Sequence, residues 1–232
     1  MSTQWYAERK GWTLGRANVV VEGNLDVRYF CLADKVHFGE FGHRLLTSDF
    51  RILSSGTGDA GGTDGVFREF LTLFNLSQVD LDANGKRKYR IAALFDDDGA
   101  GRAKGAQLLK ANRTLRAGRD VFMLRRRWPE RLLAPDLVEK YLLEANAPYG
   151  DLPCEIEDLL GSTLVELFLD QYPQFSRRRI VKGDGFHVDW GDDAKHALVR
   201  FAEEFASPSE LQGLSAVAQG LRHFMGAPRL GV

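Results

Sequence analysis

The stretch 91–102 constrains the fold most, because an apolar run there ends in three consecutive carboxylates. The run 91–95 is short and bounded by turn residues, which is typical of a strand buried on both faces of a sheet. Asp96, Asp97 and Asp98 would then lie at the carboxyl edge, where open α/β folds keep their sites. Three adjacent acids need a counter-charge, and oxygen ligands suit Mg²⁺. An acidic turn that caps the next helix explains this stretch alone equally well.

The hydrophobic pattern predicts strands at 18–22, 49–54, 89–95 and 120–124, with helices between them. This alternation predicts an α/β fold, with a parallel sheet of about four strands and helices on both faces. The first 17 residues carry no clear pattern, and 37–48 is expected to be a loop. After 125 the chain is α-rich. We expect helices near 136–144, 155–170, 192–206 and 209–224, and a hairpin at 178–190. The expected parts are therefore an N-terminal segment (1–17), a sheet domain (18–125) and an α-rich extension packed on it (126–232).

Composition excludes several classes of protein. Cys31 and Cys154, the two cysteines, provide neither a disulfide framework nor a zinc site. No apolar run approaches a membrane span, and the first residues lack a signal-peptide core, so a soluble cytoplasmic protein is expected.

The net charge of −1 gives no general argument for a polyanionic partner, but residues 86–131 hold fourteen Lys or Arg against five Asp or Glu. A basic field around carboxylates suits an enzyme that acts on phosphodiesters. Solvated helix faces would explain these charges equally well.

A second acidic element follows the first predicted strand, where Glu22 ends the strand and Asp26 begins the next helix. If the first and third strands are neighbours, Glu22 and Asp26 meet Asp96 and Asp98 at one sheet edge. Four such carboxylates would have raised pKa values and would disfavour folding unless cations neutralise them. Bound Mg²⁺ would also lower the pKa of a coordinated water. Asp26 alone is more often a carboxylate that complements the helix dipole.

These residues resemble the TOPRIM domain. Its motifs are a glutamate in a strand–Glu–Gly turn, similar to V-V-V-E-G at 19–23, and D-x-D-x-x-G, similar to residues 96–101. The resemblance covers about 18–125 and implies a TOPRIM-like, Rossmann-like fold. Asp26 looks like the OLD-family and related small TOPRIM nucleases. Those families also carry an acidic element after the sheet, similar to Glu155-Ile156-Glu157, and a lysine on a later helix, similar to Lys195.

The resemblance implies a site for Mg²⁺ or Mn²⁺, with two ions expected for a two-metal mechanism. Its expected ligands are Glu22, Asp26, Asp96, Asp98, Glu155 and Glu157. Lys195 would offset charge on the scissile phosphate, and Lys182 competes for that role. Asp97 is expected to point away. Alternatively, the acids at 155–158 belong to the first turn of a helix and Lys195 is a surface lysine. Expected contacts to nucleic acid come from Arg102, Lys104, Arg125, Arg126, Arg127 and Lys182.

The glycine-rich stretch 56–61 formally matches G-x-G-x-x-G, the dinucleotide-binding fingerprint. It follows the second strand rather than the first, and no acid-terminated strand is placed for a ribose. A phosphate-contacting loop beside the metal site is preferred, and a simple mobile loop is about as good an explanation. The sequence has no Walker A motif, so ATP hydrolysis by this chain is not expected.

Among TOPRIM activities, topoisomerases need further domains and bacterial-type primases need a zinc region. The leading hypothesis is therefore a Mg²⁺-dependent endonuclease that hydrolyses DNA. OLD-type enzymes join this domain to an ATPase, so the resemblance also implies a separate ATPase partner, in an anti-phage defence system. The alternatives are an endonuclease for tRNA or rRNA and a non-catalytic subunit with a nucleic-acid-binding or regulatory role.

Overall fold

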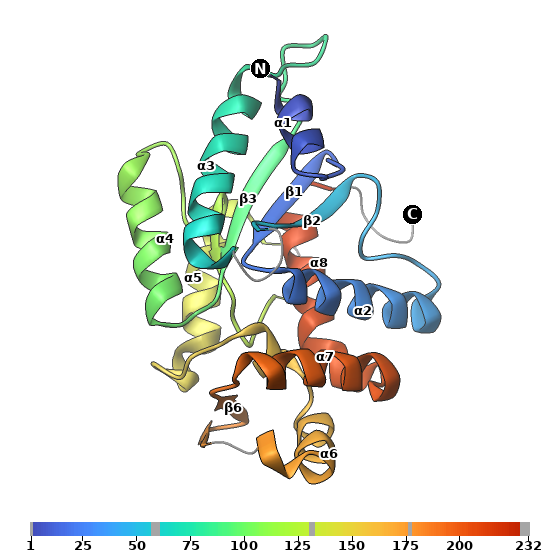
Figure 1. The fold of residues 1–232 in the computed structure, drawn as a ribbon. Coiled ribbons are helices and arrows are strands. Elements are labelled where there is room, and N and C mark those ends of the chain that lie inside the picture. Colours follow the sequence, from blue (N-terminus) through green and yellow to red (C-terminus); the bar gives the residue numbers. More distant parts are fainter. Residues whose placement is uncertain (1, 57–60, 130–132, 176–177, 228–232) are drawn as a thin grey trace.

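The computed structural model describes residues 2–56, 61–129, 133–175 and 178–227 (Figure 1). Its centre is a sheet of four parallel strands in the order β2-β1-β3-β4. The strands are β1 (Ala17–Val21), β2 (Phe50–Ser54), β3 (Arg90–Phe95) and β4 (Val121–Met123). The predicted α/β fold with a parallel sheet of about four strands is confirmed. Because all strands run the same way, their carboxyl ends share one edge.

Helices cover both faces of the sheet (Figure 1). The helices α3 (Gly62–Val79) and α4 (Gly99–Ala111) lie on one face, and α2 (Asn24–Phe41) and α8 (Gln212–Phe224) lie on the other. The β-branched side chains of β1 pack against the helices on both faces of the sheet. Val20 packs with the α3 side, whereas Val19 and Val21 pack in the larger core with α2 and α8. This explains why the strand is continuously apolar rather than alternating.

Two helix boundaries differ from the predicted ones, and one helix forms where none was predicted, each for a local reason. α2 runs into the expected loop and ends at Gly42, whose φ of 74° favours glycine. The helix predicted from about 103 to 115 is α4, which begins earlier, at Gly99, because Asp98 caps it. In the first 17 residues, α1 (Thr3–Arg9) begins after Ser2, whose hydroxyl accepts a hydrogen bond from the Trp5 amide at 3.1 Å.

The C-terminal half contains α5 (Pro135–Asn146), α7 (Asp192–Phe205) and the predicted hairpin, formed by β5 (Arg179–Lys182) and β6 (Gly185–Val188). The single helix predicted at 155–170 is wrong. A 3₁₀ turn, η3 (Ile156–Leu159), is separated from α6 (Ser162–Gln171) by extended backbone at Gly161. The Gly161 amide donates to the Glu210 carbonyl at 2.9 Å, so this tertiary contact replaces a helical bond. The remaining 3₁₀ turns are η2 (Ala147–Tyr149), η4 (Pro173–Phe175) and η5 (Ser209–Leu211).

The C-terminal half packs on the sheet through a shared core. The ring of Phe122 in β4 stacks on that of Phe224 in α8, with centroids 6.4 Å apart, and Trp128 packs beside both. α6, α7 and the hairpin lie beyond the carboxyl ends of the strands (Figure 1). None of the helices in the described ranges is apolar over enough length to cross a membrane.

Candidate functional site

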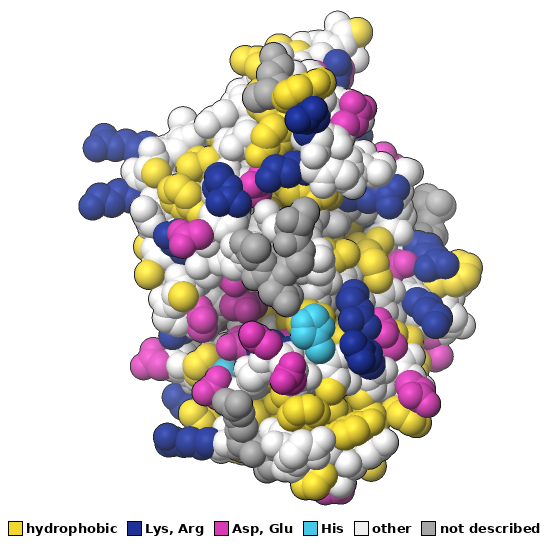
Figure 2. All heavy atoms as spheres, viewed as in Figure 1, with side chains coloured by type: hydrophobic (Ala, Val, Ile, Leu, Met, Phe, Trp, Pro, Cys, Tyr) yellow, Lys and Arg dark blue, Asp and Glu magenta, His cyan; other side chains and the backbone are white. Residues whose placement is uncertain are grey.

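A cleft of about 270 Å³ lies at the carboxyl edge of the sheet, beside the ends of β1 and β3. Five carboxylates from four chain segments line it, together with one lysine. The carboxylates are Glu22, Asp26, Asp96, Glu157 and Asp192, and the lysine is Lys195. Asp and Glu side chains gather in the middle of the molecular face shown in Figure 2. The cleft therefore concentrates acidic groups where the sheet topology leads one to expect a site.

The first two acidic elements meet because β1 and β3 are neighbours in the sheet. Glu22 directly follows β1, and its Oε1 accepts a hydrogen bond from the Asp96 amide at 3.4 Å. Asp26 lies in the first turn of α2, and its Oδ2 accepts from the Gly23 amide at 2.8 Å. Asp26 thus caps its helix, as the simpler interpretation expected, and also lines the cleft.

The third acidic element reaches the cleft through a short backbone pairing. The Asp97 amide donates to the Cys154 carbonyl at 2.9 Å, and the Cys154 amide donates to the Asp97 carbonyl at 3.2 Å. This antiparallel bridge fixes residues 155–157 beside the end of β3. Glu157, which is 1 % exposed, lines the cleft from there.

Lys195 is the cation of the cleft. Its Nζ lies 2.6 Å from Glu155 Oε2 and 3.8 Å from Glu157 Oε2. Burial acts to lower the pKa of Lys195, but Glu157 and Glu155 outweigh it and raise that pKa above its ordinary value. Lys195 is therefore charged and held among the acids. Lys182, the competing candidate, is exposed in the hairpin with its ammonium beside Gly150.

Four carboxyl groups of the cleft, those of Glu22, Asp26, Asp96 and Glu157, hold their protons unusually strongly. Burial, with the charge of Asp26, raises the pKa of Glu22 to about 7. Burial likewise raises the pKa of Asp26 to about 6 and that of Glu157 to about 7. The pKa of Asp96 lies well above its usual value because of burial and the charges of Asp26 and Glu22. One lysine thus leaves the cluster short of positive charge near neutral pH.

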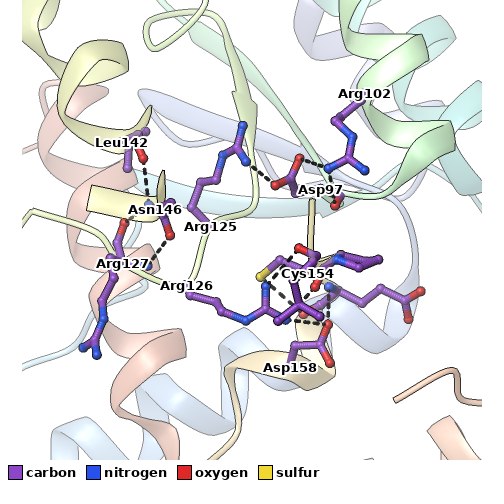
Figure 3. A network of polar contacts seen from close by, with 12 residues as sticks. Asp97, Arg102, Arg125, Arg126, Arg127, Leu142, Asn146, Cys154 and Asp158 are labelled. Carbon is purple, nitrogen blue, oxygen red and sulfur yellow. Dashed lines mark hydrogen bonds and ion pairs between the residues drawn. The ribbon is translucent and has the colours of Figure 1, made fainter. Parts of the chain in front are cut away.

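Asp97 and Asp98 have other partners. The Asp97 carboxylate, 3 % exposed, forms ion pairs with Arg102, at 3.1 Å, and with Arg125 (Figure 3). Asp98 Oδ1 accepts a hydrogen bond from the Gly101 amide at 2.6 Å and so caps α4. Neither carboxylate lines the cleft. Asp97 is directed at its arginines, and Asp98, expected as a ligand, instead occupies the capping role that was the alternative for this stretch.

The arginines expected to contact nucleic acid are bound within the protein. Arg102 and Arg125 pair with Asp97, and Arg127 pairs with Asp184. Arg126 is buried, lies 3.4 Å from Asp158 and donates to the Phe186 carbonyl at 2.6 Å (Figure 3). Lys104 forms an ion pair with Asp64 at 2.6 Å. These contacts neutralise much of the basic field that the sequence suggested.

Most of the glycine-rich stretch 56–61 lies outside the described residues, which resume at Gly61. A Cβ at Gly61 would overlap the Glu22 carbonyl oxygen, so the end of this stretch lies against the turn that carries Glu22. Gly62 lines the cleft. The phosphate-contacting loop and the simple mobile loop, the two interpretations of this stretch, therefore both stay predictions.

The cleft has the ligand atoms that a hard divalent cation prefers, but these atoms are not arranged around a common point. Glu157 Oε2 is buried and has no hydrogen-bond partner among the described residues, and carboxylate oxygens are the ligands that Mg²⁺ prefers. However, no group of three or more His, Cys, Asp or Glu in the described ranges is arranged to hold a metal ion. Glu22, Asp26, Asp96 and Glu157 would have to turn towards one another to do so.

Sequence reasoning missed two features near the cleft. Asp192 and His196 line it from the same helix as Lys195. Asp192 precedes Lys195 by three residues, a helical spacing that would have suggested it, whereas His196 is the next residue and carries no such signal. Asp158 is buried, accepts from His187 Nδ1 or shares a proton with it at 2.8 Å, and also binds the Glu155 amide. This pairing across the sequence has no local signal.

Comparison with known proteins identifies no relative of this chain: no family model matches it, and no curated protein or solved structure shows significant similarity. The TOPRIM resemblance therefore rests on the two motifs and their order in the sequence.

Proposed function

We propose that this protein is a Mg²⁺-dependent endonuclease that hydrolyses phosphodiester bonds, with DNA as the first substrate to test. The observation that carries the proposal is the convergence of Glu22, Asp26, Asp96 and Glu157 on one cleft with raised pKa values. Such a cluster binds cations to relieve its repulsion. The order of the two acidic motifs, which resembles TOPRIM nucleases, supports the same conclusion.

Each residue then has a defined task. Glu22, Asp96 and Glu157 would hold the ions, with Asp26 fixed by the Gly23 amide and able to orient a bound water. Bound Mg²⁺ supplies stabilisation of charge on a phosphoryl oxygen and a more acidic water. Lys195 lines the same cleft and would offset charge on the substrate phosphate once Glu155 releases it. Asp98 and Asp97 support α4 and the 154–157 segment rather than the reaction.

A second candidate is a non-catalytic protein that keeps this fold. It is favoured by the position of Lys195, whose ammonium already neutralises Glu155 and Glu157, and by the internal pairing of the expected nucleic-acid contacts. In such a protein Lys195 would be a permanent substitute for the metal. The two candidates differ in whether divalent ions bind and whether nucleic acid is cut.

The test is cleavage of plasmid, single-stranded DNA and tRNA with Mg²⁺ or Mn²⁺. Glu22→Ala and Asp96→Ala are compared with Glu144→Ala, which alters an exposed acid on α5. We expect the site variants to lose roughly a hundredfold or more in rate and the control to keep its rate. Preference for tRNA would move the substrate to RNA. Equal product from all four proteins would show that the cleft is not the active site. No cleavage by any of them would favour the non-catalytic candidate.

A further inference from the structure

A second cavity, of about 560 Å³, lies at the opposite, amino-terminal edge of the sheet. Four arginines line it: Arg16 before β1, Arg87 and Arg90 at the start of β3, and Arg119 before β4. Parallel strands begin at one edge, so segments distant in sequence deliver these cations to one place. Three of the four belong to the basic stretch 86–131, in which Arg102, Arg125, Arg126 and Arg127 instead form ion pairs within the protein.

Most of this positive charge forms no ion pair with the residues that the structure describes. Asp120 is the acid that lines the cavity, and it pairs with Arg119 at 2.6 Å while accepting from the Arg116 amide at 3.0 Å. Over the described ranges, Arg16, Arg87 and Arg90 form no ion pair. Three guanidinium groups therefore remain to balance an anion.

Arg90 is the most constrained of these cations. It is half-buried, and its Nη2 makes one long hydrogen bond, 3.5 Å, to the Arg119 carbonyl. Burial lowers the pKa of Arg90, and Arg119 and Arg87 lower it further, although Asp120 acts against them. A partly dehydrated guanidinium with free donors binds phosphate oxygens in a bidentate manner.

The cavity also has an apolar wall. Phe74, Tyr89, Ile91 and Met225 line it, and the Arg87 guanidinium lies over the Phe74 ring at 5.7 Å from the centroid. The Tyr89 hydroxyl donates to Gln4 at 3.1 Å, which holds its ring at the cavity. A flat ring beside several guanidinium groups suits a ligand that combines a planar base with phosphates.

We infer that this cavity binds a nucleoside phosphate, with two or more phosphate groups on Arg87, Arg90 and Arg16 and the base against Tyr89. Its volume falls in the range of small-molecule sites and is too small for a folded nucleic acid. The ligand is either a free nucleotide or the terminal nucleotide of a strand, since both present the same groups. The inference does not depend on the proposed nuclease, because the acidic cleft is at the other edge of the sheet.

The test is calorimetric titration of the intact protein with ADP, inorganic phosphate and a 5′-phosphorylated single strand of DNA. We expect ADP to bind, more weakly at high salt, and Arg87→Gln and Arg90→Gln each to weaken it by about tenfold or more. Arg200→Gln, an exposed arginine on α7, is the control and should not change binding. Glu22→Gln should bind ADP as the wild type does, which separates this result from failure of the nuclease.

Arg87 is exposed, so Arg87→Gln keeps the test valid if Arg90→Gln fails to fold. Tight binding of the DNA strand, lost in Arg87→Gln, with no binding of ADP would assign the cavity to strand ends and overturn the free nucleotide. Phosphate that binds as tightly as ADP would overturn the role of the base. No binding of any of the three, or ADP binding that Arg87→Gln and Arg200→Gln leave unchanged, would overturn the site.

Discussion

Lys195 Nζ lies 2.6 Å from Glu155 Oε2, inside a cleft that three other segments line with carboxylates. This ion pair joins α7 to the segment that the Asp97–Cys154 bridge attaches to β3. Among the described residues, Lys195 is the one lysine lining the cleft, whereas five carboxylates do so. The balance between these charges determines both the stability of the protein and its capacity to bind a cation.

Replacing Lys195 should test that balance. Lys195→Met leaves Glu155 and Glu157 without their cation, so we expect the free energy of unfolding in urea to fall by about 2 kcal/mol, since a partly buried pair is broken. Lys110→Met, on the exposed face of α4, is the control and should change it by less than about 0.5 kcal/mol. Millimolar Mg²⁺ should recover part of the loss. A stability equal to that of the control would show that Lys195 does not balance the acids.

Stability should also fall as the pH rises. Glu22, Asp26 and Glu157 have folded-state pKa values of about 7, 6 and 7, above their ordinary values, so the folded protein binds protons that the unfolded chain releases. Their contribution is complete below their ordinary pKa values and is lost as the pH rises through about 7. Without divalent ions, we expect Tm to be roughly 5 °C lower at pH 8 than at pH 5.5. Glu22→Gln should flatten this dependence, and a Tm that rises over the interval would contradict the assignment.

Gly101 tests how closely α4 approaches the end of β3. A Cβ at Gly101 would overlap the Asp96 carbonyl oxygen, a backbone atom that cannot turn aside. We expect Gly101→Ala to cost roughly 3 kcal/mol in the free energy of unfolding. Gly99→Ala, two residues earlier in the same helix, meets no atom within 4 Å and should be neutral or stabilising by up to about 1 kcal/mol. Equal effects of the two substitutions would argue against this packing.

Replacing Arg126 and Arg127 in turn should show whether each arginine stabilises the fold or binds nucleic acid. The Arg126 side chain is 7 % exposed and faces the fully buried Asp158, whereas Arg127 and Asp184 form an exposed pair. Arg126→Met should therefore cost roughly 3 kcal/mol in stability, and Arg127→Met less than about 1 kcal/mol. Chemical denaturation measures both. A stable Arg126→Met protein that binds DNA more weakly would instead support the contact to nucleic acid that the sequence suggested.

The sequence was most informative where a local pattern determines the structure. The apolar runs before Glu22 and Asp96 predict two buried strands. The two acids meet because these strands are neighbours in the sheet, which the sequence analysis could only assume. The sequence also offered helix capping by Asp98 as an alternative to metal binding. In the structure Asp98 accepts a hydrogen bond from the Gly101 amide, so it caps the helix.

Other features depend on contacts that no local pattern records. The break at Gly161 arises from Glu210, about fifty residues later, and the partners of Arg125 and Arg126 are acids that sequence spacing does not connect to them. The arginine cavity has the same origin, since Arg16, Arg90 and Arg119 meet only when three strands begin at one edge. A count of basic residues along the chain could not separate the paired arginines from the unpaired ones.

The most direct test of the central claim is calorimetric titration of the metal-free protein with Mn²⁺ and Mg²⁺ at pH 7.5. The proposed site predicts binding of up to two ions, weakened at least about tenfold in Glu22→Gln and in Asp96→Asn, because each removes a carboxylate ligand. Glu144→Gln, on the exposed face of α5, should bind as the wild type does. Absence of binding by the wild type at millimolar ion concentrations, or equal binding by all four proteins, would contradict a metal site in this cleft.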